Sequence, residues 1–297
     1  MAYAPSPRPT FDGPAQIPYA QVTRHLWGES DAGEVADWIY ASTDKIHQLV
    51  FGLAPGGSFR HSDSFRTIFG ADELLYVLEG TMLIANPQTG EVHRVQQGES
   101  AFFRRNTWHH AYNGGPDLLR VLEYFAPPPS TGTSGAYAQK QPYLEKSRYT
   151  RDELLGTIPM QNAEIRQANT IQVVREADYV WRLEGDPAHN LRPVLVGLMA
   201  ATDHLTVGKV YLQPGQKTEL QSHAGDESIC VTQGRLNLHA PDAEGQKWFE
   251  LYPDDGFYLP QGAPHQYYNM TGAPVEFIFG VAPGYLPDDL PHDKETT

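Results

Sequence analysis

The sequence contains a single cysteine, Cys230, among 297 residues. One cysteine cannot form an intramolecular disulfide, and no cluster of thiolates is available to hold a metal ion. The chain also lacks any run of about 18 apolar residues, so we expect no membrane span. Its N-terminus has no apolar core of a secretory signal. Together these absences predict a cytoplasmic protein that makes no contact with a membrane.

Positive charge is scarce as well. Lysine and arginine number 22 against 36 aspartates and glutamates, which gives a formal net charge of -14 with histidine counted as neutral. Such a surface repels phosphates, so nucleic acid and anionic membranes are not expected as partners. A small-molecule substrate stays open, because the local field of a pocket can oppose the net charge. We also expect the chain to form a homodimer.

Signals for helices are few. The chain is interrupted by 24 prolines and 27 glycines, which favours many short strands over long helices. The one strong helix signal is a capping box from Thr150 to Glu153, and Pro159 ends that helix. With 40% hydrophobic residues the chain can bury a sizeable core. The composition therefore predicts an all-β protein with one short helix.

The two halves of the chain repeat each other. Glu73 recurs as Glu227 at an offset of 154 residues (227 − 73), and His109 recurs as His265 at an offset of 156 (265 − 109). This pattern predicts the duplication of one antiparallel double-sheet unit. We place an N-terminal unit with a proline-rich arm in residues 1–135, a connection with the short helix in 136–170, and a C-terminal unit in 171–297.

The second half contains side chains that can hold a metal ion. Gln221 and His223 are two residues apart, and alternation along a strand puts them on one face. Glu227 follows after a short turn, and His265 comes later in the same half. Two imidazoles, a carboxylate and an amide oxygen form a site for a divalent transition metal, and they suit Fe(II), Mn(II), Ni(II), Co(II) or Zn(II). Tyr267 has the strand parity to face the same site.

The spacing in this half resembles the two consensus motifs of the cupin superfamily. The residues that match are Gly215, Gln221, His223, Glu227 and Gly234 in the first motif, and Pro260, Gly262, His265 and Asn269 in the second. Gln221 replaces the first histidine, and Asp254 replaces the opening glycine of the second motif. The resemblance implies a bicupin: two tandem cupin barrels, each a double-stranded β-helix or jelly roll, with a short helical connection.

The N-terminal copy of the site is altered. Glu73 follows Gly56 by 17 residues (73 − 56), whereas Glu227 follows Gly215 by 12 (227 − 215), so the first half carries an insertion. A possible second metal site consists of His61, Glu73 and His109, if the strand that carries His61 slips or bulges. Alternatively, this barrel is structural or binds an organic ligand through Arg60, Arg66, Arg104 and Arg105.

Apart from its tails and connection, the chain resembles bicupin dioxygenases such as the quercetin dioxygenases. In that family a metal held by three histidines and a glutamate binds the enolate of the substrate. The resemblance makes Gln221, His223, Glu227 and His265 the metal ligands and favours Fe(II). It also makes Glu227 the catalytic base, and Tyr267 is the other catalytic candidate. The leading hypothesis is a dioxygenase that acts on a small aromatic or enolisable substrate.

Two alternatives stay open. The order glutamine, histidine, glutamate, histidine is similar to the zinc site of phosphomannose isomerases, which implies a metal-dependent sugar isomerase or lyase. The other alternative is a non-catalytic bicupin that only binds a ligand. Bound iron would favour the dioxygenase, and bound zinc or manganese would favour the isomerase or lyase.

Overall fold

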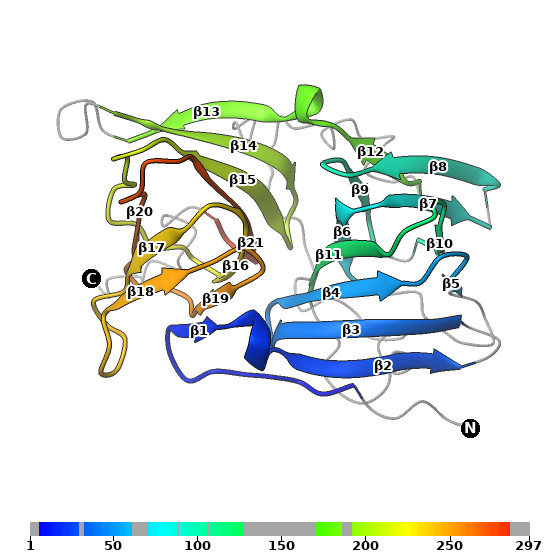
Figure 1. The fold of residues 1–297 in the computed structure, drawn as a ribbon, viewed down its shortest axis with the longest axis horizontal. Helices are drawn as coiled ribbons and strands as arrows, with labels where there is room; N and C mark the ends of the chain where they lie inside the picture. The colour runs from blue at the N-terminus through cyan, green and yellow to red at the C-terminus, as the bar shows by residue number, and fades with distance from the viewer. Residues whose placement is uncertain are drawn as a thin grey trace, which may run out of the picture.

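The computed structural model describes residues 6–29, 33–60, 70–87, 89–105, 107–127, 170–185 and 192–285. Over these ranges the chain forms two β-barrels that stand side by side, one built mainly from each half of the sequence (Figure 1). The predicted all-β class with two tandem barrels is confirmed. The predicted helix at Thr150 lies outside the described residues.

The first barrel is a double sheet made of ten strands from the first half and one short strand from the second. These are β2 (Thr23–Glu29), β3 (Gly33–Ser42), β4 (His47–Leu53), β5 (Ser58–Arg60), β6 (Asp72–Glu79), β7 (Thr81–Asn86), β8 (Glu91–Gln96), β9 (Ser100–Phe103), β10 (His110–Asn113), β11 (Leu119–Ala126) and β12 (Gln172–Val174). The large sheet has the order β12-β9-β6-β11-β4-β3-β2, and the small sheet has the order β5-β10-β7-β8.

The second barrel repeats this plan. Its strands are β1 (Ala15–Ile17), β13 (Val180–Glu184), β14 (Val194–Ala201), β15 (Thr206–Leu212), β16 (Asp226–Gln233), β17 (Leu236–His239), β18 (Trp248–Leu251), β19 (Gly256–Leu259), β20 (Gln266–Tyr268) and β21 (Val275–Ala282). The large sheet has the order β1-β19-β16-β21-β15-β14-β13, and the small sheet has the order β18-β17-β20. The described helical elements are two short 3-10 turns, η1 (Tyr19–Gln21) and η3 (Glu176–Asp178).

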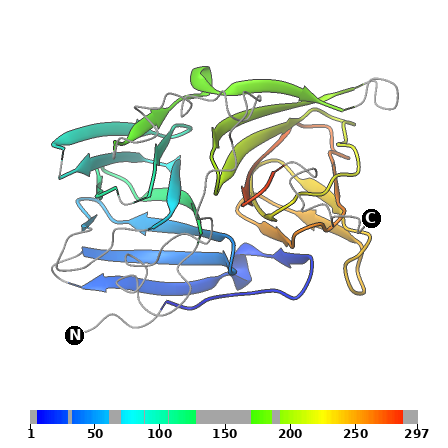
Figure 2. The same ribbon diagram turned by 180° about the vertical axis from the view of Figure 1, so that it is seen from behind.

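Strand β1 and strand β12 are exchanged between the barrels. Strand β1 opens the chain but pairs with β19 of the second barrel, where Ala15 lies opposite Tyr258. Strand β12 follows the connection but pairs with β9 of the first barrel, where Val173 lies opposite Ala101. Seen from behind, the N-terminal segment runs along the first barrel before β1 joins the second (Figure 2). The sheet hydrogen bonds therefore cross the boundaries that we predict near residues 135 and 171.

The central strands of the large sheets are buried on both faces, whereas the small sheets are buried on one. Strand β7 alternates between half-buried and buried residues, which is typical of a sheet with one face exposed to solvent. The first six residues of β6 and of β16 are all buried. One face of each of these strands lines its own barrel, and the other face packs against the neighbouring barrel. The apolar runs in these strands are therefore buried on both sides, because they contact both the interior of their own barrel and the neighbouring barrel.

A shared core joins the two barrels. It includes Tyr40 and Tyr124 of the first barrel and Met199, Cys230 and Ile278 of the second. The Tyr124 hydroxyl donates hydrogen bonds to the backbone oxygens of Ser228 (3.0 Å) and Ile278 (3.3 Å). Burial of each large aromatic side chain stabilises the pair by roughly 1.5–3 kcal/mol. This core explains why the lone cysteine is buried.

The glycine at position 280 is required by this contact. Gly280 is the counterpart of Tyr124 in the repeat (280 − 124 = 156). A Cβ atom at Gly280 would lie 2.4 Å from the ring of Tyr124, a distance that only a shift of the backbone or the ring could relieve. The duplicated position therefore carries a large side chain, Tyr124, in the first barrel and a residue without a side chain, Gly280, in the second.

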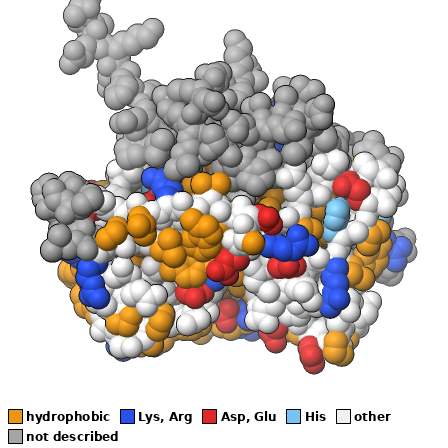
Figure 3. Space-filling view, turned by 90° about the horizontal axis from the view of Figure 1, so that it is seen from above, with side chains coloured by type: hydrophobic (Ala, Val, Ile, Leu, Met, Phe, Trp, Pro, Cys, Tyr) orange, Lys and Arg blue, Asp and Glu red, His pale blue; other side chains and the backbone are white. Residues whose placement is uncertain are grey.

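The outer surface mixes charge with apolar residues. On the face seen from above, apolar side chains gather where β13 and β14 lie, with charges of both signs around them (Figure 3). Trp181, Leu183 and Leu195 are the exposed large apolar residues of these strands. Within the described ranges, every helical element is too short and too polar to cross a bilayer.

Candidate metal centre

Two backbone segments bring the predicted ligands of the second barrel together. Gln221 and His265 form an isolated antiparallel bridge, and each backbone NH donates to the other residue's oxygen at 2.9 Å. The NH of Gly262 donates to the oxygen of His223, also at 2.9 Å. Gln221 and His223 therefore lie in an irregular segment before β16, not in the regular strand that we expected. Their side chains still share one face, because the bridge keeps the segment extended.

Backbone carbonyls fix the orientation of both imidazole rings. Nδ1 of His223 donates to the oxygen of Tyr285 at 2.7 Å, and Nδ1 of His265 donates to the oxygen of Ala263 at 3.0 Å. A carbonyl oxygen only accepts, so the proton of each neutral ring resides on Nδ1. Each Nε2 then presents a lone pair to Glu227, whose Oε2 lies 3.6 Å from His223 Nε2 and 2.9 Å from His265 Nε2.

This arrangement fits a cation. Oε2 of Glu227 is buried and accepts no hydrogen bond, because both neighbouring nitrogens carry lone pairs. The ligand atoms of His223, Glu227 and His265 all lie within 4.8 Å of one another. Two lone pairs and a carboxylate held in a buried space repel one another until a positive charge joins them. Histidine and carboxylate donors suit a divalent first-row metal.

Gln221 lies beside the same centre. Its amide nitrogen is 3.1 Å from Nε2 of His265. The nitrogen and oxygen of an amide exchange places by a half-turn of the group, so the same position can present an oxygen to a metal. The structure therefore brings all four predicted ligands of the second barrel together.

The centre opens into a small cavity. Its walls include Glu184 on β13, Tyr267 on β20, Phe279 on β21, and Tyr285, with a volume of about 10 Å³. That volume suits about one water molecule. Tyr267 was expected here from its strand parity, whereas Glu184 and Tyr285 were not expected from the sequence. The alternation of β13, which points Val180, Arg182 and Glu184 to one face, could have indicated Glu184. Tyr285 follows the last strand and gives no such signal.

Tyr285 and Glu184 form a second layer against His223. The Tyr285 ring stacks on the His223 ring at 4.7 Å between centroids. Its hydroxyl donates to Glu184 at 3.0 Å, and Arg182 lies 3.3 Å from the same carboxylate. One tyrosine therefore contacts His223 twice, through its ring and its backbone oxygen, and is itself held by β13.

The protonation states in the cavity differ from group to group. Burial acts to raise the pKa of Glu227, but positive charge on the imidazoles of His265 and His223, when they are protonated, outweighs it and leaves that pKa lowered. Burial and the Glu227 carboxylate raise the pKa of Tyr267 well above its ordinary value. Burial also raises the pKa of Glu184. The cavity thus combines an ionised carboxylate with a protonated phenol and with a second carboxyl group that holds its proton more tightly than usual.

The first barrel brings together two of its three predicted ligands. Nε2 of His109 lies 3.7 Å from Oε2 of Glu73, and both residues are buried. Nδ1 of His109 faces the oxygen of Thr107 at 3.1 Å, as His265 faces Ala263. His61 lies outside the described residues. Among the residues that the structure describes, the second barrel alone holds three potential ligand atoms close enough for one metal ion.

Two of the arginines proposed as ligand-binding groups of the first barrel, Arg104 and Arg105, contact a buried aspartate of that barrel. Nε of Arg104 lies 3.0 Å from Oδ1 of buried Asp72, and the NH of Arg105 donates to the same oxygen at 3.2 Å. Arg60 is exposed on β5, and Arg66 lies outside the described residues. Arg104 therefore neutralises a buried carboxylate of its own barrel.

The interior of the first barrel is more acidic than that of the second. Asp37 and Glu123 occupy the positions that Val196 and Phe279 hold in the second barrel (196 − 37 = 159 and 279 − 123 = 156). Burial raises the pKa of Asp37, and Glu123 raises it further. Burial, with Glu123 close by, raises the pKa of Glu73 well above its usual value. The two barrels have therefore diverged in chemistry where they keep the same fold.

Replacing Glu123 with glutamine should flatten the pH dependence of stability. Burial raises the pKa of Glu123 to about 8, against about 4.3 in an unfolded chain. Between these values the folded protein keeps a proton that the unfolded chain releases. Stability is therefore greatest below the unfolded pKa and falls as the pH rises towards 8, by up to roughly 1.4 kcal/mol per unit.

Urea denaturation of the parent and of Glu123→Gln at about pH 5 and about pH 8 measures this effect. We expect the parent to lose more stability than the variant over that interval. Equal losses in the two proteins would mean that Glu123 is ionised in the folded state.

Comparison with known proteins agrees with this architecture. The family model described as "Cupin domain" matches residues 50–125 and 208–281, one region in each barrel. No curated protein sequence matches the chain. Similar solved structures include a Pseudomonas aeruginosa protein described as glyoxylate-induced, with 17% identity, a TM-score of 0.64, and coverage of 93% of this chain and 91% of that one.

Two further structures have the same fold at lower identity. The Escherichia coli protein YlbA is 9% identical, with a TM-score of 0.62 and coverage of 91% of this chain and 90% of that one. The oxalate decarboxylase of Lactobacillus farciminis, solved as a formate complex, is 13% identical, with a TM-score of 0.58 and coverage of 95% and 90%. At such identities the likeness concerns the fold, and the chemistry must be argued from the site.

Proposed function

The chain belongs to the cupin superfamily as a two-barrel member, and from that premise we propose that its second barrel is the centre of a metal-dependent dioxygenase for a small enolisable substrate. The observation that carries the proposal is the convergence of Nε2 of His223, Nε2 of His265 and Oε2 of Glu227 in a buried space. Gln221 completes the donor set. When bound, a divalent metal such as Fe(II) supplies Lewis acidity and access to one-electron chemistry.

The residues of the chain supply proton transfer and shape. Oε2 of Glu227 is the ionised acceptor next to the substrate position, so it takes the proton from the enolisable carbon or the enol hydroxyl. The Tyr267 hydroxyl keeps its own proton, because burial and Glu227 raise its pKa. The buried hydroxyl has no hydrogen-bond partner among the described residues, so it is available to donate a hydrogen bond to Glu227 when the proton moves. Phe279 and Val196 line the cavity and keep water from the reacting carbon.

The size of the cavity favours a small substrate. About 10 Å³ of space adjoins the ligand atoms, which is room for about one water molecule, so any organic substrate enters only if the lining side chains move, and a small substrate needs the least movement. Of the two substrate classes expected from the sequence, small enolisable molecules such as hydroxyketones and keto acids therefore suit the site better than flavonoids.

A metal-dependent isomerase or lyase is the second candidate. Glu184 lines the same cavity as Glu227, and burial raises its pKa while that of Glu227 is lowered. Two carboxyl groups with opposite pKa shifts are an acid and a base in one site. Such a pair supports proton shuttling between neighbouring carbons without dioxygen.

Dioxygen consumption by the Fe(II)-loaded protein tests the proposal. We expect uptake with a panel of small hydroxyketones and keto acids, in a one-to-one ratio with substrate lost. Tyr267→Phe should lower kcat by about 10²–10⁴-fold, while the metal content stays at the level of the parent, because the hydroxyl is not a ligand.

Product formation without dioxygen uptake would replace the dioxygenase with the isomerase or lyase. If the protein binds these compounds but converts none of them under aerobic or anaerobic conditions, the non-catalytic ligand-binding bicupin becomes the favoured hypothesis. Loss of metal from Tyr267→Phe would contradict a role limited to hydrogen bonding with Glu227.

A further inference from the structure

Asp226, the residue before Glu227, is a buried hub of hydrogen bonds. Its Oδ2 accepts from the hydroxyl of Tyr258 at 2.7 Å, and its Oδ1 accepts from the NH of Gln261 at 3.0 Å. Two more partners come from the first barrel: Thr43 Oγ1 lies 3.0 Å from Oδ2, and Lys45 Nζ lies 3.0 Å from Oδ1. The Asp226 side chain is 2% exposed, so these contacts replace its hydration.

These bonds act on both segments that carry metal ligands. Asp226 begins β16, and the next residue is Glu227. Gln261 belongs to the turn that leads to His265, and Gly262 of the same turn donates to the oxygen of His223. A displacement of the Asp226 carboxylate would therefore move Glu227 directly and His265 through the turn.

The loop of the first barrel that reaches Asp226 is held by several hydrogen bonds of its own. The NH groups of Lys45 and Ile46 donate to Oγ1 of Thr43 at 3.1 and 3.2 Å. Arg8 of the N-terminal arm donates to the oxygen of Thr43 at 2.7 Å. These hydrogen bonds hold the backbone of Lys45 in place. Its ammonium group lies 3.0 Å from Oδ1 of Asp226 and neutralises that carboxylate. Loss of one partner of such a pair leaves a buried charge uncompensated.

In the first barrel the equivalent carboxylate has a cation within its own barrel. This carboxylate is Asp72, which precedes Glu73 and pairs with Arg104 at 3.0 Å. In the second barrel the residue after the corresponding strand is Pro260, which carries no charge. The cation for the second site therefore comes from the opposite barrel.

We propose that Lys45, with Thr43, is a positioning residue for the metal centre of the other barrel: it fixes Asp226 and so sets the distances between Glu227, His265 and His223. The inference rests on the metal centre of the proposed function. Through Lys45 and Thr43 the first barrel then contributes to the geometry of the second site, even if the first barrel binds no metal itself.

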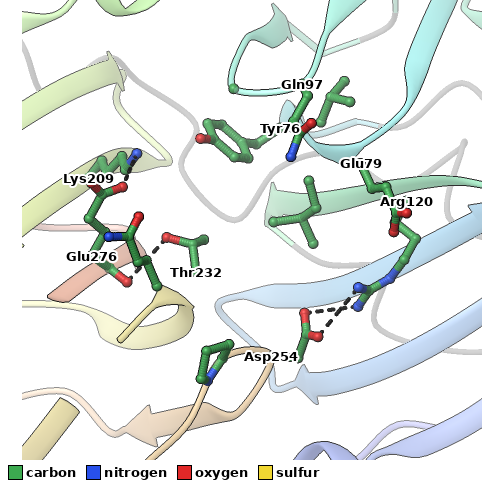
Figure 4. A pocket seen from close by; sticks show the side chains of 13 residues that line it. Tyr76, Glu79, Gln97, Arg120, Lys209, Thr232, Asp254 and Glu276 are labelled. Carbon is green, nitrogen blue, oxygen red and sulfur yellow. Dashed lines mark hydrogen bonds and ion pairs between the residues drawn. The ribbon is translucent and has the colours of Figure 1, made fainter. Parts of the chain in front are cut away.

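A matched pair of variants tests this inference. Lys45→Met keeps most of the side-chain stem and removes the charge next to Asp226. Arg120→Met is the control, because Arg120 also links the barrels, through Asp254 at 2.9 Å, but that contact involves neither ligand segment. Figure 4 shows the Arg120–Asp254 pair across a cleft of about 520 Å³ from the Lys209–Glu276 pair.

The measurement is Zn(II) affinity by chelator competition, together with thermal unfolding of the metal-free proteins. We expect Lys45→Met to weaken Zn(II) binding about 10–100-fold, as loss of an outer-shell partner does, and Lys45→Arg to restore most of it. Arg120→Met should lower Tm and leave the affinity at the level of the parent. Thr43→Val, which removes one bond and no charge, should give a smaller loss of affinity than Lys45→Met.

The outcomes separate the two claims. A parent protein that binds no Zn(II) overturns the metal centre and this inference with it. A parent that binds, with Lys45→Met and Thr43→Val both unchanged in affinity, overturns the positioning role alone. Equal loss of affinity in Lys45→Met and Arg120→Met also overturns it, because the effect would then belong to the barrel interface in general.

Discussion

Replacing His265 with alanine should remove the metal ion from the purified protein. Nε2 of His265 lies 2.9 Å from Oε2 of Glu227, and its ring is fixed by the Ala263 oxygen. Without this imidazole the site keeps one histidine and one carboxylate among its strong donors. We expect the affinity to fall by more than the roughly 100-fold that marks the upper range for outer-shell partners.

Metal-to-protein ratios after purification without chelators or a histidine tag measure this effect. A saturating metal stabilises a protein by about 2.7 kcal/mol at 100 times its Kd, so the variant should also lose the rise in Tm that the metal gives the parent. His239→Ala is the control, because His239 stacks on Trp248 at 4.4 Å on the outer small sheet. Stoichiometric metal in a His223→Ala/His265→Ala double variant would contradict the assignment.

The two glutamates that the repeat makes equivalent should behave differently. Glu227→Gln should lose both metal and turnover, because the amide removes the only negative charge between two imidazole lone pairs. Glu73→Gln should lose neither. Among the described residues, Oε2 of Glu73 faces the imidazole of His109 at 3.7 Å, and burial with Glu123 nearby raises the pKa of Glu73. An amide therefore replaces a carboxyl group that is already disposed to be neutral.

Metal content and turnover of the two variants, measured side by side, decide between the barrels. If Glu73→Gln alone abolished metal binding or turnover, the working site would consist of His61, Glu73 and His109. In that case the second barrel would have only a structural role, and the contact of Lys45 with Asp226 would not position a metal site.

The sequence was sufficient for the fold class and for naming the candidate ligands that the structure brings together in the second barrel. The reason is that both depend on short-range patterns: alternation along strands, turn glycines, and the spacing from Gln221 to Glu227 and from Pro260 to His265. Side chains two or four residues apart on one segment stay close to each other wherever that segment lies in the fold. The same local character explains why Tyr267, two residues after His265, could be placed in the site.

Only the tertiary structure decided how the two barrels depend on each other. Lys45 and Asp226 are separated by 181 residues in the chain, and Tyr285 reaches the His223 ring from 62 residues away. The exchange of β1 and β12 likewise joins segments from opposite halves. Such contacts arise from the packing of one complete barrel against another, and no periodicity in either segment encodes its partner. For this reason the sequence indicated which side chains form the candidate metal centre, and the packing of the barrels determined which residues hold those side chains in place.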